Sequence, residues 1–273
     1  MAVPVTEEQK KSPLYKYYEM DIAPVPADLA AWIMTSPVNE TDGLEFKDAH
    51  KLMDPGYLPG NADFGVYKMP DGGFSIANTT PMIGVTSEMF AWWFAWHGLD
   101  SFRYTIWDKD DHWYCQTLDP QLNLDASKPM AERFYGQKHE IKETLMDGQP
   151  EPDRIVTLHF LHPTELGIDG EKYEKFDGVI ACTLGAMVHC FRNTPYGGEL
   201  RTRFWFGYEY ADGEYRRGMG PGPGSMPEEI QIGMCRAMLM HNVKEYRHMA
   251  KILPQLYAEF KDDFLVGVED KYK

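Results

Sequence analysis

Alternating apolar and polar positions dominate the middle of the chain. Between residues 101 and 210, segments rich in β-branched and aromatic residues are separated by turn-forming pieces such as 108–111 and 193–198. Because successive side chains of a strand point to opposite faces, this pattern predicts an antiparallel meander of about six or seven strands. The segments are SFRYTIWD (101–108), HWYCQTL (112–118), RFYGQKHEIKETLM (133–146), DRIVTLHFLH (153–162), GVIACTLGAMVHCFRN (178–193) and GGELRTRFWFGYEY (197–210).

A different period, with apolar residues three or four apart, marks the end of the chain. Ser225 and Glu228 match a capping box, and Pro227 suits the first turn of a helix. Pro254 is expected to end or kink that helix, because proline cannot donate a backbone hydrogen bond. We predict one long C-terminal helix whose core-facing stripe is Ile230, Met234, Ala237, His241, Glu245, His248 and Ile252.

The first part of the chain shows no sustained period. Within residues 1–80, only 27–34 suggests a short helix, and 53–65 is rich in Gly and Pro and is interpreted as a loop. Residues 87–98 are a strongly aromatic helix candidate. We expect an irregular N-terminal region over 1–80 and a main domain over 81–273. A curved antiparallel sheet wrapped on a long C-terminal helix is typical of the START-like helix-grip fold, an α+β architecture that encloses a cavity.

Composition narrows the class of protein. Hydrophobic residues make up 43% and aromatic residues 14% of the chain, which is enough for a packed core. The net charge of −15 argues against a surface for nucleic acid or anionic lipid. We find no signal-peptide core, no apolar run of membrane-spanning length and no Cys-x-x-Cys pair. We therefore expect a cytoplasmic protein with four reduced, buried cysteines: Cys115, Cys182, Cys190 and Cys235.

The predicted C-terminal helix carries an ionisable pair on its apolar stripe. His241 and Glu245 are four residues apart, so both side chains project from one helix face. Such pairs are common on solvated helix faces, and that alternative stays open. A carboxylate on a core stripe, however, costs on the order of several kcal/mol unless it is paired or coordinated. A metal ion held by both side chains would balance the charge.

Two upstream residues are candidates for completing this site. His112 shares one face of its predicted strand with Tyr114 and Gln116, and Glu143 shares one face of the next strand with Ile141. Two histidines and two glutamates suit zinc with an open position for water, and manganese or iron are alternatives. The remaining histidines are interpreted as surface or packing residues: His50, His97, His159, His162 and His248.

Four parts of the chain share residue types, order and spacing with one known family: residues 90–114 (FAWWFAWHGLDSFRYTIWDKDDHWY), Glu143, residues 201–207 (RTRFWFG) and residues 241–245 (HNVKE). They resemble the zinc-dependent 2,4-diacetylphloroglucinol hydrolase and phloretin hydrolase family, over roughly residues 80–260. In that family a histidine is followed about 31 residues later by a glutamate, and a His-x-x-x-Glu pair lies near the C-terminus. The resemblance implies a zinc site formed by His112, Glu143, His241 and Glu245.

The resemblance also implies residues that meet the substrate. The family's tyrosine eight residues before the first histidine corresponds to Tyr104, which on an alternating strand is otherwise interpreted as core or cavity lining. An active-site histidine of the phloretin-cleaving branch corresponds to His189, and a second tyrosine near the metal corresponds to Tyr208. The diacetylphloroglucinol branch carries Asn three residues after the first histidine, where this chain has Cys115. That departure leaves the acylphenol substrate open.

Together these assignments imply a hydrolase that cleaves the carbon–carbon bond between an acyl carbonyl and a polyhydroxylated aromatic ring, giving a carboxylic acid and a phenol. The expected partners are a small acylphenol, Zn²⁺ (or Mn²⁺ or Fe²⁺) and a second copy of the chain in a homodimer, with no nucleic acid or membrane. Two other functions are compatible with the sequence. One is a non-catalytic helix-grip binder of hydrophobic or phenolic molecules, and the other is a metal-dependent hydrolase of β-diketones or other polyketides. The aromatic segment 87–98 could also serve oligomerisation.

Overall fold

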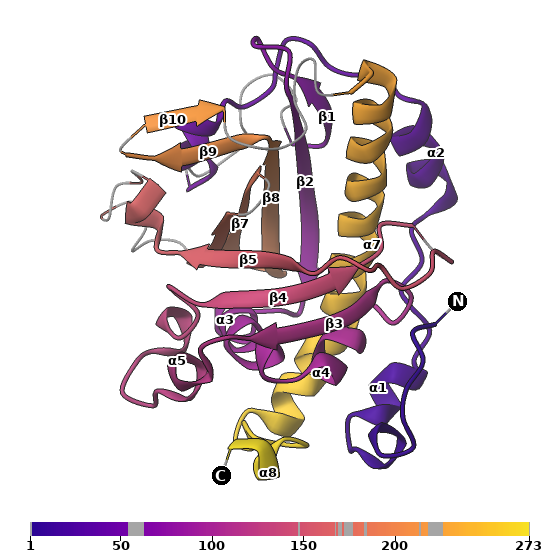
Figure 1. Ribbon diagram of the computed structural model, residues 1–273, viewed down its shortest axis with the longest axis vertical. Helices are drawn as coiled ribbons and strands as arrows, with labels where there is room; N and C mark the ends of the chain where they lie inside the picture. The colour runs from indigo at the N-terminus through magenta and orange to yellow at the C-terminus, as the bar shows by residue number, and fades with distance from the viewer. Residues whose placement is uncertain are drawn as a thin grey trace.

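One eight-stranded antiparallel sheet and one long helix organise the chain (Figure 1). The computed structural model describes residues 2–53, 63–146, 148–166, 168, 171, 177–182, 185–212, 214–217 and 226–272. The expected α+β class, with an antiparallel sheet and a long C-terminal helix, is confirmed.

The strand order of the large sheet is β1-β2-β8-β7-β6-β5-β4-β3. Strands β3, β4, β5, β6 and β7 each pair with the next strand along the chain, which forms a meander that ends at β8. A separate hairpin pairs β9 with β10. The strands are β1 (Gly65–Lys68), β2 (Phe74–Ile83), β3 (His112–Thr117), β4 (Lys138–Glu143), β5 (Val156–Leu161), β6 (Asp177–Cys182), β7 (Gly185–Thr194), β8 (Gly197–Phe206), β9 (Tyr208–Ala211) and β10 (Glu214–Arg217).

The sheet bends strongly along its length. In Figure 1, β2, β7 and β8 run along the long axis of the molecule, whereas β3, β4 and β5 cross it. The last helix, α7, packs on β1 and β2 and also against α2 and α3. The helices are α1 (Tyr15–Glu19), α2 (Ala27–Thr35), α3 (Ser87–Trp96), α4 (Ser101–Thr105), α5 (Pro120–Leu124), α7 (Glu228–Phe260) and α8 (Glu269–Tyr272), with 3₁₀ turns η1 (Gln9–Lys11), η2 (Phe46–Met53), η4 (His97–Leu99), η5 (Met130–Glu132) and η6 (Pro163–Leu166).

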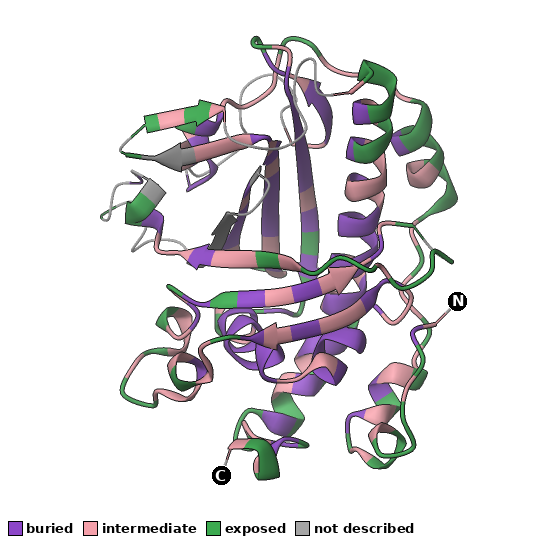
Figure 2. Ribbon diagram, in the orientation of Figure 1, coloured by how far each residue is buried: buried purple, intermediate pink, exposed green. Residues whose placement is uncertain are grey.

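Helix α7 is buried mainly in its second half (Figure 2). Of the predicted stripe, Ile230 and Met234 are exposed, whereas the stripe is buried from His241 onward. Pro254 does not end the helix, which continues to Phe260. The buried side chains around it hold the backbone in place despite the lost hydrogen bond. Ser225 of the predicted capping box lies outside the described residues.

Two expectations about secondary structure are wrong or incomplete. Residues 101–108 do not form a strand: α4 begins at Ser101, where the Asp100 side chain accepts a hydrogen bond from the Phe102 backbone N–H. The alternation of apolar and polar residues in this segment does not mark a buried and an exposed face, because residues 102–107 are all buried. In the N-terminal region, β1 and β2 join the large sheet, and β2 crosses the expected boundary at residue 80. The division of the chain into two parts stays a prediction.

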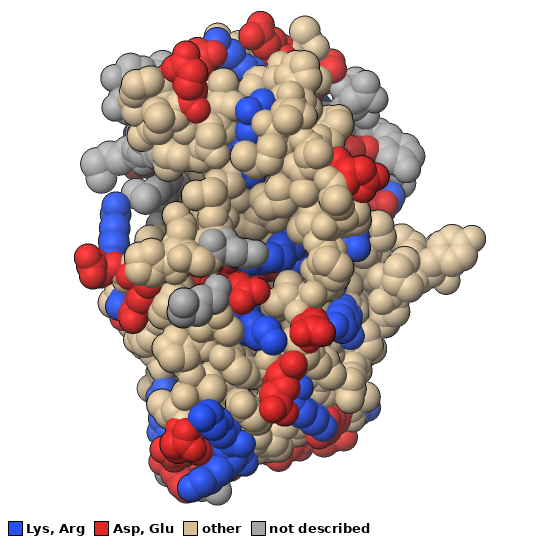
Figure 3. Space-filling view, turned by 90° about the vertical axis from the view of Figure 1, so that its right-hand side faces the viewer, with Lys and Arg blue, Asp and Glu red and all other residues tan. Residues whose placement is uncertain are grey.

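The aromatic segment 87–98 supplies the centre of the core. Trp92, Trp93 and Trp96 are each at most 1% exposed, so they pack inside the chain instead of presenting a surface for oligomerisation. The cysteines whose side chains are described, Cys115, Cys190 and Cys235, are free and buried, as expected. On the face seen in Figure 3, Lys and Arg are interspersed with Asp and Glu. Among the described residues, we find no helix both long and apolar enough to cross a bilayer.

Candidate metal centre and substrate cavity

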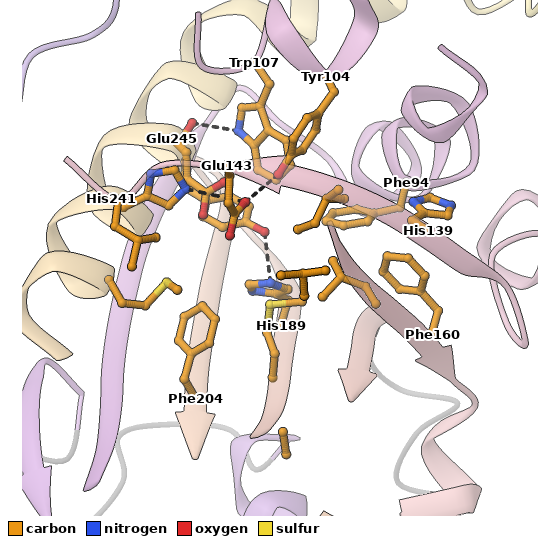
Figure 4. A pocket seen from close by; sticks show the side chains of 18 of the residues that line it. Phe94, Tyr104, Trp107, His139, Glu143, Phe160, His189, Phe204, His241 and Glu245 are labelled. Carbon is orange, nitrogen blue, oxygen red and sulfur yellow. Dashed lines mark hydrogen bonds and ion pairs between the residues drawn. The ribbon is translucent and has the colours of Figure 1, made fainter. Parts of the chain in front are cut away.

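A cavity of about 310 Å³ lies between the bent sheet and α7 (Figure 4). Most of its wall is apolar and aromatic, which suits a flat organic molecule. Its aromatic lining comprises Phe94, Tyr104, Trp107, Phe160, Phe204, Trp205, Phe206 and Tyr246.

The four residues expected to bind a metal meet at one place. His112 begins β3 and pairs directly with Glu143, the last residue of β4. His241 and Glu245 come from adjacent turns of the buried part of α7. His112 Nε2 lies 3.6 Å from Glu245 Oε2, and His241 Nε2 lies 4.0 Å from Glu143 Oε2. Strand pairing joins His112 to Glu143, and the pitch of α7 places His241 and Glu245 on one helix face. Tertiary packing then brings these two pairs together, although they lie about a hundred or more positions apart in the chain.

The two histidines are oriented alike. His112 Nδ1 lies 3.2 Å from the backbone carbonyl oxygen of Tyr104, and His241 Nδ1 lies 3.5 Å from Asp111 Oδ2. The contact of His241 with Asp111 is at ion-pair distance and is not a hydrogen bond. In both rings the δ-nitrogen faces an oxygen atom and the ε-nitrogen faces a glutamate. His112 Nε2 is buried and has no hydrogen-bond partner among the described residues. Such an arrangement is typical of histidines that hold a metal.

The electrostatics of this cluster also fit a cation. Burial, and to a smaller degree Glu143, raise the pKa of Glu245 to about 8. Burial works against protonation of His241, but Asp111, Glu245 and Glu143 outweigh it and raise the pKa of His241 to about 9. Burial, together with the nearby His241, holds the pKa of His112 well below its usual value, so this ring is neutral. Carboxylates crowded in a buried place are short of positive charge, which a divalent ion would supply.

Tyr104 joins this cluster from α4. Its ring stacks on the ring of His112 with 3.9 Å between centroids, and its hydroxyl donates a 2.6 Å hydrogen bond to Glu143 Oε2. The residue lines the cavity, as its alternative interpretation also allows. It reaches Glu143 from a helix and not from the strand that its sequence pattern indicated.

His189 lies in the cavity wall opposite the metal candidates, on β7 (Figure 4). Its Nδ1 is 2.8 Å from the Thr202 hydroxyl, and its Nε2 is 3.1 Å from the Tyr246 hydroxyl. Burial lowers the pKa of His189 to about 3, so the ring is neutral at ordinary pH. A neutral imidazole between two hydroxyl groups can accept or pass a proton.

Tyr208 lies elsewhere. Its hydroxyl donates a 2.5 Å hydrogen bond to Asp71, and the guanidinium of Arg217 lies over its ring, 4.3 Å from the centroid. Tyr208 lines a separate surface cavity together with Phe46 and Tyr215. The structure therefore does not bring it to the cavity of His241.

Tyr246 lies in the cavity next to Glu245, where we expected a second tyrosine. The sequence analysis did not identify this residue. It is fully buried, lines the cavity and packs edge-on against Trp107, whose indole N–H donates to the Glu245 backbone carbonyl. It escaped notice because it does not lie on the apolar stripe of His241 and Glu245. The available signal was its position next to Glu245, since this part of α7 is buried on all sides.

Two further groups of possible ligands lie close by. Asp108 lies with His112 and His241 in a group whose possible ligand atoms are within 4.8 Å of one another. The other group is His97, Cys115 and His139. The Cys115 thiol is 3.9 Å from His139 Nδ1, and it lies behind the cavity-lining ring of His139.

Comparison with known proteins shows the family of the chain. The DAPG hydrolase PhiG domain family matches residues 44–258. The chain is 36% identical to a phloretin hydrolase from Eubacterium ramulus, over 96% of this chain and 95% of that protein. It is 26% identical to a 2,4-diacetylphloroglucinol hydrolase from Pseudomonas sp, over 92% of this chain and 89% of that protein. The homologous enzyme from Pseudomonas protegens is also 26% identical, with 85% of its length covered. The chain therefore belongs to the DAPG hydrolase family.

Proposed function

We propose that this protein is a metal-dependent hydrolase of acylated polyhydroxybenzenes, which splits the ring from its acyl group to give a phenol and a carboxylic acid. One observation carries the proposal: two histidines and two glutamates converge at the end of an aromatic cavity. Family membership and the names of the relatives, phloretin hydrolase and 2,4-diacetylphloroglucinol hydrolase, support the reaction class.

His112, Glu143, His241 and Glu245 are the proposed ligands of a divalent ion, with Zn²⁺ first and Mn²⁺ or Fe²⁺ as alternatives. All of these except His112 line the cavity, whereas Asp108 does not. A catalytic ion needs a position that substrate can reach, which favours the two glutamates over Asp108. The carboxylate of Asp108 is also 3.1 Å from the ammonium group of Lys244.

The reaction adds the elements of water across one carbon–carbon bond. The water oxygen bonds to the acyl carbon, the bond from that carbon to the ring breaks, and its electron pair stays on the ring carbon, which takes up a proton. A bound divalent ion would supply a Lewis acid and lower the pKa of the attacking water. Phenolic hydroxyls ortho to the acyl group make the ring a better leaving group, because the negative charge is shared as an enolate.

The chain's own residues then hold the ring and move protons. Tyr104 fixes the carboxylate of Glu143 and presents its hydroxyl at the reacting end of the cavity. His189 of β7 and Tyr246 of α7 form a hydrogen-bonded pair in the cavity lining, where they can bind phenolic oxygens or pass a proton to the ring. General acid–base assistance of this kind contributes about 10²–10⁴-fold to a rate.

The deciding experiment pairs metal analysis with a substrate panel. The purified protein is assayed with phloretin, 2,4-diacetylphloroglucinol and a simple β-diketone, and the products are identified by mass spectrometry. We expect stoichiometric metal, release of a phenol and an acid from at least one acylphenol, and loss of turnover with a chelator. Metal-free protein that binds the phenols unchanged would instead indicate a binding protein, and turnover of the diketone alone would indicate a different hydrolase.

Several finer assignments belong to the same proposal. The bent sheet around α7 fits the START-like helix-grip fold. We keep residues 1–80 as the proposed N-terminal region and 81–273 as the proposed catalytic domain, with β2 joining the two. A homodimer in the cytoplasm is the proposed working form. Light scattering of the purified protein at several concentrations tests the assembly, and fractionation of cells tests the location.

A further inference from the structure

Three residues form a buried layer behind the candidate metal centre: Asp111, Thr144 and Lys244. Each is the chain neighbour of a candidate ligand, since Asp111 precedes His112, Thr144 follows Glu143 and Lys244 precedes Glu245. Neighbouring side chains point in different directions from a strand or a helix. The ligands therefore meet on the cavity side, and their neighbours meet on the far side.

Asp111 is the centre of this layer. Its carboxylate accepts hydrogen bonds from the Thr144 hydroxyl and the Lys244 ammonium group, and its Oδ2 lies 3.5 Å from His241 Nδ1. The residue is 1% exposed and does not line the cavity. The ammonium group of Lys244 pairs directly with this carboxylate, which supplies the positive charge that a buried aspartate needs.

An ionised carboxylate on one nitrogen of an imidazole has two effects on the other nitrogen. It keeps the proton on Nδ1, so the lone pair of Nε2 is available, and it makes that lone pair more basic. The Nε2 atom of His241 is the one that faces Glu143. Lys244 allows the carboxylate to remain charged in a buried place, and Thr144 fixes its orientation.

We propose that Asp111 is a positioning residue that holds His241 in its metal-binding tautomer and sets the affinity of the site for a divalent ion. This inference rests on the proposed metal-dependent function, and it concerns a residue that would touch neither ion nor substrate. His112 has a backbone carbonyl in the corresponding place, so the two histidines would differ in basicity.

Asp63 provides a control outside the candidate centre. Like Asp111 it lies beside a buried cation, with its Oδ1 3.5 Å from Arg203 Nη2. It neither lines the cavity nor belongs to either group of possible metal ligands. Asp111→Asn and Asp63→Asn therefore each remove one carboxylate charge beside a cation, and only Asp111→Asn changes a contact with His241.

The test measures metal affinity and not only activity. Zn²⁺ dissociation constants are determined by competition with a chromophoric chelator for wild type, Asp111→Asn, Asp111→Ala and Asp63→Asn, each checked for folding by circular dichroism. We expect Asp111→Asn to weaken binding about 10–100-fold, Asp111→Ala at least as much, and Asp63→Asn to match wild type. In ¹⁵N spectra of histidine-labelled, metal-free protein recorded above pH 9, where the His241 ring is neutral, His241 should carry its proton on Nδ1 in wild type and show a mixture of tautomers in Asp111→Ala.

The outcomes separate this inference from the function on which it rests. Wild-type protein that binds no divalent ion would overturn the proposed metal centre itself. Wild-type protein that binds Zn²⁺, with Asp111→Asn binding it equally well and the tautomer of His241 unchanged, would overturn only the role of Asp111. Equal weakening by Asp63→Asn and Asp111→Asn would also overturn it, because that result assigns the effect to the lost charge and not to the contact with His241.

Discussion

At the scale of single residues, the candidate centre depends on two neighbouring carboxylates, Glu143 and Glu245, whose charge a divalent ion would balance. We expect Glu245→Ala and His112→Ala to lose bound metal and turnover together. The loss of affinity should exceed the ~10–100-fold typical of substitutions behind the ligands. Metal content and product formation measure both effects. Glu229→Ala, an exposed change on the same helix, is the control, and full metal with full turnover in either ligand variant would rule the site out.

Tyr104 offers a cleaner separation of binding from catalysis. Tyr104→Phe keeps the ring that stacks on His112 and removes only the hydroxyl that donates to Glu143. We expect metal content to stay near wild type and kcat to fall by ~10²-fold or more, as for loss of a group that assists proton transfer. A variant with unchanged kcat would show that Tyr104 only fills space.

His189 and Tyr246 should act as a unit. The 3.1 Å contact between them predicts that Tyr246→Phe and His189→Gln together slow turnover by less than the product of their separate effects. The comparison requires kcat/KM for both single variants and the double variant. Strictly multiplicative effects would mean that the two side chains work independently.

At the scale of elements, one glycine fits η4 against β4. A Cβ atom on Gly98 would lie 2.3 Å from Cε1 of His139, whose Nε2 is held 2.7 Å from Gln137 Oε1. Because the His139 ring cannot move away freely, we expect Gly98→Ala to destabilise the protein by about 1–3 kcal/mol.

In α7, a Cβ atom on Gly233 would contact no other atom within 4 Å, so Gly233→Ala should stabilise the helix by about 0.5–1 kcal/mol. Denaturant unfolding at one metal concentration measures both, and equal effects would contradict the packing described.

The elements also show where sequence patterns mislead. Residues 101–108 alternate like a strand, but Ser101–Thr105 form α4, because Asp100 caps the helix and the surrounding core buries residues 102–108. The pattern of 1–80 gave no sign of β2, although this strand pairs with β8 over nine positions and lies against α7. Burial on both faces removes the contrast between apolar and polar positions on which such predictions depend.

At the scale of the whole molecule, buried neutral histidines make stability depend on pH. Burial lowers the pKa of His97 to about 4, whereas a histidine in the unfolded chain titrates near 6.5. Between these values the unfolded chain binds more protons, so this contribution to the unfolding free energy falls as pH falls. Its slope approaches about 1.4 kcal/mol per pH unit.

The contribution of one histidine is isolated by difference. In unfolding curves measured from pH 7 to pH 4, wild type should lose stability more steeply than His97→Gln. The subtraction removes the opposite contribution of Glu245, whose raised pKa favours the folded state as pH falls. Parallel curves for the two proteins would mean that His97 is not held neutral.

The sequence by itself determined the strands of the meander, the long last helix and the four ligand candidates. The strands and the helix follow from local periodicity. The ligand candidates follow from the presence of His and Glu side chains at positions that the periodicity predicts to be buried. Only the tertiary structure decided which side chains share the cavity. It placed Tyr208 beside Asp71 and Tyr246 beside His189, and it put Asp111 behind His241. The physical reason is that contacts between distant segments depend on how the sheet bends and how α7 packs on it, and neither leaves a periodic trace in the chain.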